Sequence, residues 1–226
     1  MAPRDVSKYI EETLKYIFGD LTEIMSREVP ASYPLVLLVF AGIEFLSRLL
    51  YDDPTNESRS SRFFLNWMSE QDARYGYGGM DIQRSFGAYL YKFARSALAH
   101  SASVQDLVAV EHKDDERNNH LKYVRHKSGR RILLIHSYQF SDDFISAADA
   151  VLERIAEDTK FCHDVGKRIG ALEKEWTRSS KRFADKASVS VSESGSVSES
   201  AVDWGFGEGE LKKPDSGTYT PGTGFS

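Results

Sequence analysis

The most apolar stretch of the sequence is PLVLLVFAGIEFLSRLLY, residues 34–51. Its apolar side chains are nearly continuous, which predicts a helix that is buried on all sides at the centre of a folded core. The uninterrupted apolar part, residues 34–43, is too short to span a bilayer, and Glu44 follows it directly. We therefore expect a core helix and no membrane association.

Four further segments show apolar residues at spacings of three and four, which is typical of helices with one buried face. They predict helices over residues 6–28, 58–72, 81–100 and 141–178. The glycine-rich segment 75–79 predicts a loop. The chain is thus expected to be mainly α-helical.

Three short apolar runs interrupt the helical pattern at residues 107–110, 121–124 and 132–135. Residues typical of turns separate them, which predicts three short antiparallel strands. The expected fold class is mainly α: a helical bundle over residues 1–178 with a small three-stranded antiparallel β insertion at about 104–136.

The C-terminal part, residues 179–226, has a different composition. Serine alternates with valine and glutamate over residues 188–200, and glycines follow with scattered aromatic residues. Such a segment buries too little apolar surface to offset its conformational entropy. We expect a disordered tail after residue 178.

Charge and cysteine content narrow the function classes. The formal net charge is −5, and a nucleic-acid-binding domain is usually basic, so any role with RNA must depend on local charge. The single cysteine, Cys162, excludes an intrachain disulfide and fits a reducing compartment. The first residues, 1–5, contain no apolar signal core, so we expect a cytoplasmic protein.

The strongest chemical motif is FARSALAHS, residues 93–101, in which Arg95 and His100 are five residues apart. On a straight α-helix the two side chains diverge by roughly 140°, so they converge only if the helix ends or bends near His100. A histidine can transfer protons near neutral pH, and an arginine can hold a phosphate. RNA supplies its own nucleophile, the 2′-hydroxyl. The pair is therefore sufficient for RNA cleavage without a metal or cofactor.

This motif, at the end of a helix that follows a strongly apolar bundle, resembles the HEPN superfamily over about residues 5–160. The resemblance implies a helical bundle that dimerises, with the motifs of two subunits facing each other. Many members are metal-independent endoribonucleases of toxin–antitoxin and antiviral systems, and others are inactive relatives that bind RNA. Arg95 and His100 match the motif positions. Ser96 stands where the family most often has Asn, Asp or His, and a hydroxyl can still bond phosphate.

The resemblance therefore implies a homodimeric endoribonuclease with an RNA substrate and an antitoxin or another defence-system protein as a possible partner. Ala102 occupies the position where some HEPN toxins carry a tyrosine that a partner enzyme modifies, so that form of regulation is not expected. The alternative is a non-catalytic HEPN-like module for dimerisation or for binding RNA or protein. The negative net charge and Ser96 favour this alternative.

Glu44 lies inside the most apolar helix, and a buried carboxylate needs a partner. It could orient Arg95 or His100 across the bundle and so support the site. The alternative is an exposed or interface glutamate bonded to Arg48, one turn away.

The β insertion carries the densest positive patch of the sequence: Lys122, Arg125, Lys127, Arg130 and Arg131. These side chains could bind RNA phosphates, or they could simply form a solvated hairpin surface.

Four histidines also fall in this region: His112, His120, His126 and His136. Their spacing matches no zinc-binding pattern, so we expect no metal site and ordinary surface histidines.

Overall fold

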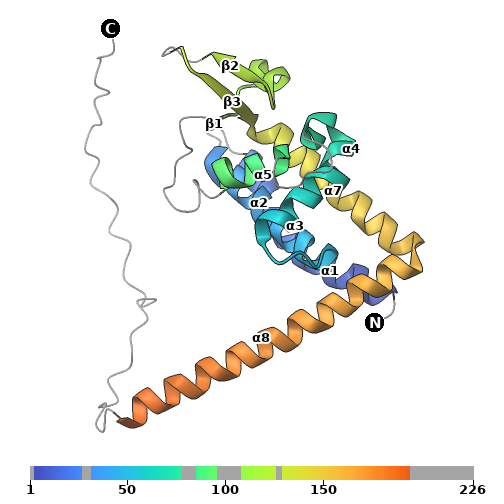
Figure 1. The fold of residues 1–226 in the computed structure, drawn as a ribbon, viewed down its shortest axis with the longest axis vertical. Helices are drawn as coiled ribbons and strands as arrows, with labels where there is room; N and C mark the ends of the chain where they lie inside the picture. The colour runs from blue at the N-terminus through green and yellow to red at the C-terminus, as the bar shows by residue number, and fades with distance from the viewer. Residues whose placement is uncertain (1–2, 27–31, 78–84, 96–107, 126–128, 194–226) are drawn as a thin grey trace. The chain divides into compact units, whose positions relative to one another are not determined.

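The computed structural model describes residues 3–26, 32–77, 85–95, 108–125 and 129–193. The chain divides into two compact units, Met1–Trp176 and Thr177–Ser226. The first unit contains a bundle of helices around α2, with a small sheet at one end of the bundle (Figure 1). The described part of the second unit is the end of one long helix.

Helix α2 (Ser32–Leu50) is the centre of the bundle and packs against α1 (Pro3–Met25), α3 (Asn56–Phe63) and α7 (Ser137–Glu157). The predicted central position of this helix is confirmed, and its bounds lie within two residues of those expected. By length and composition alone α2 could cross a membrane, but 56% of its apolar window is buried inside the protein. This is the burial expected of a core helix.

The third predicted helix consists of three pieces. Helix α3 continues into a π-helical turn (Phe64–Met68) and then into the short α4 (Ser69–Gln71). Its start is set by Thr55, whose hydroxyl accepts a hydrogen bond from the Ser58 N–H at 3.1 Å. A side-chain oxygen in this position satisfies a backbone donor that the helix itself leaves open.

The fourth predicted helix is described only over residues 85–95. Helix α5 (Phe86–Leu90) begins at Ser85, whose hydroxyl accepts from the Ala88 N–H, and continues into a second π-helical turn (Tyr91–Arg95). The remaining parts of the prediction, 81–84 and 96–100, lie outside the described residues.

The last predicted helix, 141–178, is wrong as a single element. Helix α7 begins earlier because the His136 ring accepts from the Gln139 N–H, and it ends where Asp158 takes an extended conformation. The Asp158 carboxylate then accepts from the Phe161 N–H at 2.9 Å and starts α8 (Thr159–Glu193). Residues 179–193 are therefore helical, not disordered as predicted, and residues 194–226 lie outside the described part.

The β insertion is a mixed sheet with strand order β1-β3-β2. Strand β2 (Tyr123–Arg125) pairs antiparallel with β3 (Arg131–His136), whereas β1 (Val108–Glu111) pairs parallel with β3. The prediction of an all-antiparallel sheet is therefore wrong. A 3-10 helix (Asp114–Asn119) lies between β1 and β2 in the chain, and the two strands end up at opposite edges of β3.

Aromatic side chains join the helices to each other. The Phe40 and Phe140 rings meet edge to face at 5.3 Å between centroids, and Phe64 stacks on Tyr75 at 5.6 Å. Phe64 also stacks on Phe140. All four rings are fully buried. The cluster ties α2 and α7 to the first π-helical turn, and aromatic pairs in these geometries stabilise beyond their buried area.

Helices α2 and α7 pack tightly at Gly42, where a Cβ atom would lie 2.2 Å from Cζ of Phe144. We expect Gly42→Ala to lower the free energy of unfolding by about 1–3 kcal/mol, because the buried Phe144 ring cannot move aside. This loss should exceed the gain of about 1 kcal/mol from better helix propensity. Urea denaturation followed by circular dichroism measures the difference.

The matched control is Gly19 of α1, where a Cβ would meet nothing within 4 Å. Gly19→Ala should raise the free energy of unfolding by about 0.5–1 kcal/mol. Stabilisation of the same size by both substitutions would contradict the proposed close packing.

Candidate active site

Arg95 and Glu44 form an ion pair between the second π-helical turn and the middle of α2. The Arg95 Nη2 donates to Glu44 Oε2 at 3.0 Å, and Nε contacts Oε1. Both side chains are mostly buried, with 25% of Arg95 and 20% of Glu44 exposed. Burial alone would lower the pKa of Arg95, but the hydrogen bond and charge of Glu44 outweigh it and raise that pKa. The guanidinium is therefore charged and held in one orientation.

The alternative partner for Glu44 is engaged elsewhere. Arg48, one turn further along α2, donates to Glu175 at 2.9 Å. Of the two interpretations of Glu44 drawn from the sequence, the one that pairs it with Arg95 agrees with the contact in the structure. Whether it serves catalysis stays a prediction.

Tyr91 completes this group of side chains and was not singled out from the sequence. The Arg95 guanidinium lies 5.5 Å from the centre of the Tyr91 ring, and the Tyr91 hydroxyl lies within the electrostatic reach of Glu44. Burial, followed by the charge of Glu44, raises the pKa of Tyr91. The available signal was its position four residues before Arg95, on the same helix. We call Glu44, Tyr91 and Arg95 the Arg95 cluster.

A π-helical turn, Tyr91–Arg95, carries both helix residues of the Arg95 cluster that lie outside α2. Such turns occur mostly as single wide turns within α-helices, and often at functional sites. Their hydrogen bonds join residues five apart, whereas residues five apart diverge on an α-helix. The other motif residues, Ser96 and His100, lie outside the described residues.

The basic residues of the insertion divide between the two faces of the hairpin. Tyr123 and Arg125 of β2 lie opposite Leu133 and Arg131 of β3, and directly opposed residues share a face of the sheet. Lys122 precedes Tyr123 and therefore points to the other face. The exposed Arg130 precedes Arg131 in the same way, and Lys127 lies outside the described residues.

Two of the four histidines are buried, contrary to the prediction of surface histidines. His120 is 1% exposed and His136 is fully buried, while His126 lies outside the described residues. His112 is partly exposed and its Nδ1 lies 2.9 Å from the Ser32 hydroxyl. The prediction failed because a buried histidine differs from an exposed one by its partners, and those partners are distant in sequence.

His120 belongs to a closed chain of hydrogen bonds inside the core. The His136 backbone N–H donates to His120 Nδ1 at 3.0 Å, so the proton of the neutral ring is on Nε2, 2.8 Å from the Tyr75 hydroxyl. Tyr75 donates to Asp143 at 3.0 Å, and Gln139 donates to the other oxygen of Asp143 at 2.7 Å. Burial is the main reason that the pKa of His120 falls to about 3 and that of Asp143 rises. The chain fastens the insertion to α7.

The backbone beside this chain is strained. Leu121 has a φ of 57°, in the left-handed region that a branched, non-glycine residue rarely adopts. Its N–H donates to the Leu134 carbonyl at 2.7 Å, and its side chain is buried. The hydrogen bonds of His120 and the packing of Leu121 hold this turn in place.

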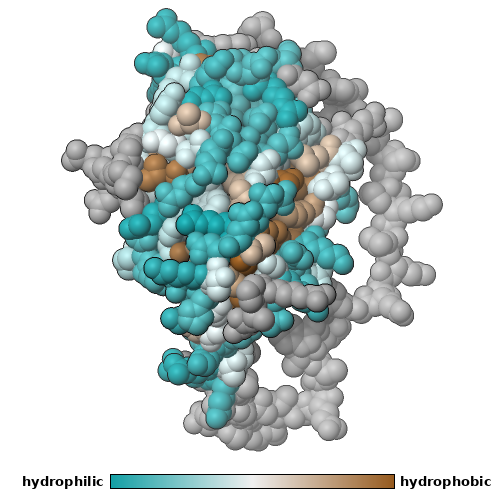
Figure 2. All heavy atoms as spheres, turned by 90° about the vertical axis from the view of Figure 1, so that its right-hand side faces the viewer, coloured by the Kyte–Doolittle hydropathy of each residue, from teal (hydrophilic) through white to brown (hydrophobic). Residues whose placement is uncertain are grey.

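Two surface pockets lie away from Arg95. An apolar pocket of about 490 Å³ lies between α1 and α2, beside Leu37 and Leu38. A polar pocket of about 280 Å³ contains Arg48 and Arg168, which pair with Glu175 and Asp52. Figure 2 shows one face of the molecule, which is mainly hydrophilic with a narrow diagonal strip of hydrophobic residues.

Within the described part of the chain, no three His, Cys, Asp or Glu side chains converge in a way that could hold a metal ion.

No protein-family model matches the sequence, and neither a curated protein nor a solved structure is similar enough to match it. The likeness to HEPN proteins therefore depends on the Arg95 motif and the order of the elements alone.

Proposed function

We propose that the protein is a metal-independent endoribonuclease of the HEPN type in which Arg95 and His100 carry the reaction. The observation that supports this best is the orientation of Arg95 by Glu44. The ion pair uses Nε and Nη2, and a guanidinium has five N–H donors, so donors remain for a phosphate. A preoriented donor stabilises developing charge without having to reorganise during the reaction.

The proposed reaction uses the 2′-hydroxyl of the RNA as nucleophile. His100 of one subunit accepts the proton as the 2′-oxygen attacks phosphorus. The bond between phosphorus and the 5′-oxygen breaks, and the protonated His100 of the other subunit supplies a proton to that oxygen. The Arg95 side chains hold the phosphate oxygens, where negative charge increases in the transition state. The products are a 2′,3′-cyclic phosphate and a 5′-hydroxyl.

The test is to incubate purified protein with RNA in the presence of EDTA and to identify the ends of the fragments. We expect cleavage in the chelator, with a 2′,3′-cyclic phosphate on one fragment and a 5′-hydroxyl on the other. Ends with a 5′-phosphate would point to a different chemistry. The proposed setting is the cytoplasm, as a toxin or antiviral effector controlled by an antitoxin or other defence protein.

The alternative is a non-catalytic module for dimerisation or for binding RNA or protein. One observation favours it: Glu44 neutralises Arg95 in a mostly buried pair, which is also how a purely structural ion pair is built. In that case RNA would be bound without being cut, and no fragments would form under the same conditions.

A composite site also requires assembly, so we expect the protein to be a homodimer with the end of the motif helix near the twofold axis. Sedimentation velocity at micromolar concentration should give the mass of two chains. A mass equal to one 25.5 kDa chain would contradict the two-subunit mechanism, although not the fold.

A further inference from the structure

The β2–β3 hairpin has one face that combines aromatic and cationic side chains. Tyr123 and Arg125 alternate with Val124 along β2, and Arg131 lies directly opposite Arg125. Because side chains alternate between the faces of a strand, these three share one face, and Lys122 belongs to the other. At its base the same face carries Leu133, which is part of the core. The hairpin extends from this base beyond the helices (Figure 1).

The pair formed by Arg125 and Arg131 is electrostatically unfavourable by itself. Like charges directly opposite each other on neighbouring strands destabilise a hairpin. Both side chains are exposed. A phosphate between two guanidinium groups would relieve this repulsion, and arginine binds phosphate through paired hydrogen bonds.

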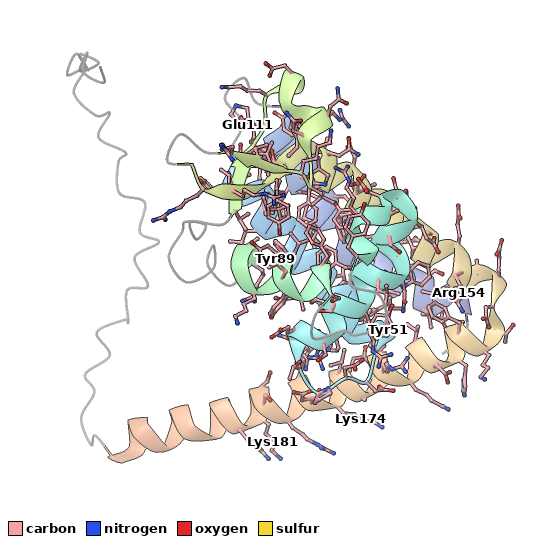
Figure 3. All side chains as sticks on the ribbon, turned by 45° about the horizontal axis from the view of Figure 1, so that its top comes forward. Tyr51, Tyr89, Glu111, Arg154, Lys174 and Lys181 are labelled. Atoms are coloured by element: carbon pink, nitrogen blue, oxygen red, sulfur yellow. The ribbon has the colours of Figure 1, made fainter. Side chains whose placement is uncertain are left out.

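Tyr123 is the aromatic component of this face. Tyr123 is 49% exposed to solvent, and the Arg131 guanidinium lies 5.3 Å from the centre of its ring. Tyr123 lies beside Tyr89 of α5 and, after burial, is a further cause that raises the pKa of Tyr89 to about 12, and Tyr89 in turn stacks on Phe86. Figure 3 shows Tyr89 on α5, close to the hairpin. The ring is therefore held in place while much of its surface stays open to solvent.

Tyr89, the neighbour of Tyr123, belongs to the same helical segment as Arg95. The six-residue separation of Tyr89 and Arg95 corresponds to about 9 Å along a helix axis.

We propose that Tyr123, Arg125 and Arg131 form a subsite for single-stranded RNA, in which a base stacks on Tyr123 and the adjacent phosphate lies between the two arginines. That the ligand is RNA rests on the proposed function. That a base would stack on the ring and a phosphate would contact the arginines follows from the side chains themselves. A single strand is favoured because its bases are available for stacking on an exposed ring, unlike those of a duplex.

The experiment measures binding separately from cleavage. A fluorescent single-stranded RNA with 2′-O-methyl riboses lacks the nucleophile, so fluorescence anisotropy with the full chain reports affinity alone. We expect Tyr123→Leu to weaken binding about tenfold, the usual range for the loss of one stacked base. Tyr123→Phe keeps the ring and should bind within about twofold of the unchanged protein.

Replacing the arginines should change the salt dependence of binding, and Lys122 provides a matched control. Arg125→Ala and Arg131→Ala should each weaken binding and should reduce the slope of log affinity against log salt by about 0.7 per lost phosphate contact. Lys122→Ala removes the same charge from the other face and should change neither quantity. Circular dichroism checks that every variant is folded.

Three results would overturn the proposal. Equal effects of Lys122→Ala and Arg125→Ala would indicate diffuse electrostatic attraction rather than a face-specific site. Equal affinity of Tyr123→Leu and the unchanged protein would exclude stacking. Tighter binding of polyglutamate than of RNA would identify a site for acidic protein segments. RNA binding with the expected pattern but no cleavage would leave this inference intact and reject only the proposed nuclease activity.

Discussion

RNA cleavage should be lost when His100 or Arg95 is replaced by alanine, with the fold preserved in both cases. Loss of a general acid or base typically costs about 10²–10⁴ in rate. Loss of a charge-stabilising donor typically costs about 10²–10³. These are the largest effects that we expect from any single substitution. The measurement is the rate of RNA cleavage in EDTA, together with a thermal melt of each variant.

Arg95→Ala needs a companion variant because it leaves Glu44 without its cation. An unpaired, mostly buried carboxylate destabilises a protein, which could be mistaken for a catalytic effect. The double variant Glu44→Gln/Arg95→Ala removes that charge, so it should melt closer to the unchanged protein and still be inactive. Lys92→Ala, exposed on the same helical segment, should keep its activity.

Two outcomes would contradict the mechanism. Cleavage by His100→Ala at the unchanged rate would exclude proton transfer by that histidine. Loss of cleavage on adding EDTA to the unchanged protein would point to a metal centre. Ser96→Asn should retain or raise activity if the residue at position 96 only helps to hold phosphate.

The second large effect is acid destabilisation through His120. The pKa of this ring is about 3 in the folded protein, against 6.5 for an unperturbed histidine. Below pH 6.5 His120 therefore binds a proton in the unfolded chain but stays neutral in the folded protein. The free energy of unfolding consequently falls as pH falls from 6.5 toward 3. The full difference corresponds to about 5 kcal/mol, because one pKa unit is about 1.4 kcal/mol.

Asp143 acts in the opposite direction. Its pKa is raised by burial, so the folded protein takes up a proton before the unfolded chain does, and this favours folding as pH falls. The measurement therefore belongs between about pH 5 and 6.5, in the upper part of the His120 window. Urea denaturation there should give a loss approaching about 1.4 kcal/mol per pH unit.

His120→Gln removes the titrating ring and should reduce the pH dependence of stability in this window. His163→Gln is the control, because His163 is exposed on α8. A pH dependence that survives His120→Gln unchanged would assign the acid sensitivity to other groups.

The helices were predictable where their signals are local. The apolar residues of α2 identify the core helix whatever surrounds it, and the bounds of α1 and α2 lie within three residues of those expected. The break at Asp158 was missed, although aspartate is a common N-cap, because the apolar spacing continues on both sides of it. A continuous pattern cannot distinguish one helix from two that pack on the same core.

The sheet and the site depend on contacts between distant residues, which local patterns do not contain. Strand positions follow from apolar runs, but the parallel pairing of β1 with β3 depends on the path of the chain between them. Arg95 was one of the candidate partners of Glu44, because a carboxylate inside an apolar helix needs a partner, but the sequence did not distinguish it from Arg48. Tyr91 and the His120–Asp143 chain carry no comparable signal, since tyrosine and histidine are common both inside and outside cores.

The wide turn at Tyr91–Arg95 has a consequence for how this chain tolerates changes in length. A π-helical turn holds one more residue than the α-helical turn that would replace it. Deleting one residue inside it would leave an ordinary α-helical turn, and the side chains that follow would keep nearly the same orientation relative to α2, because the tighter turn rotates further per residue. Arg95 would then still meet Glu44. Related sequences with one residue fewer inside this turn should therefore keep the pairing between their arginine and a carboxylate on α2.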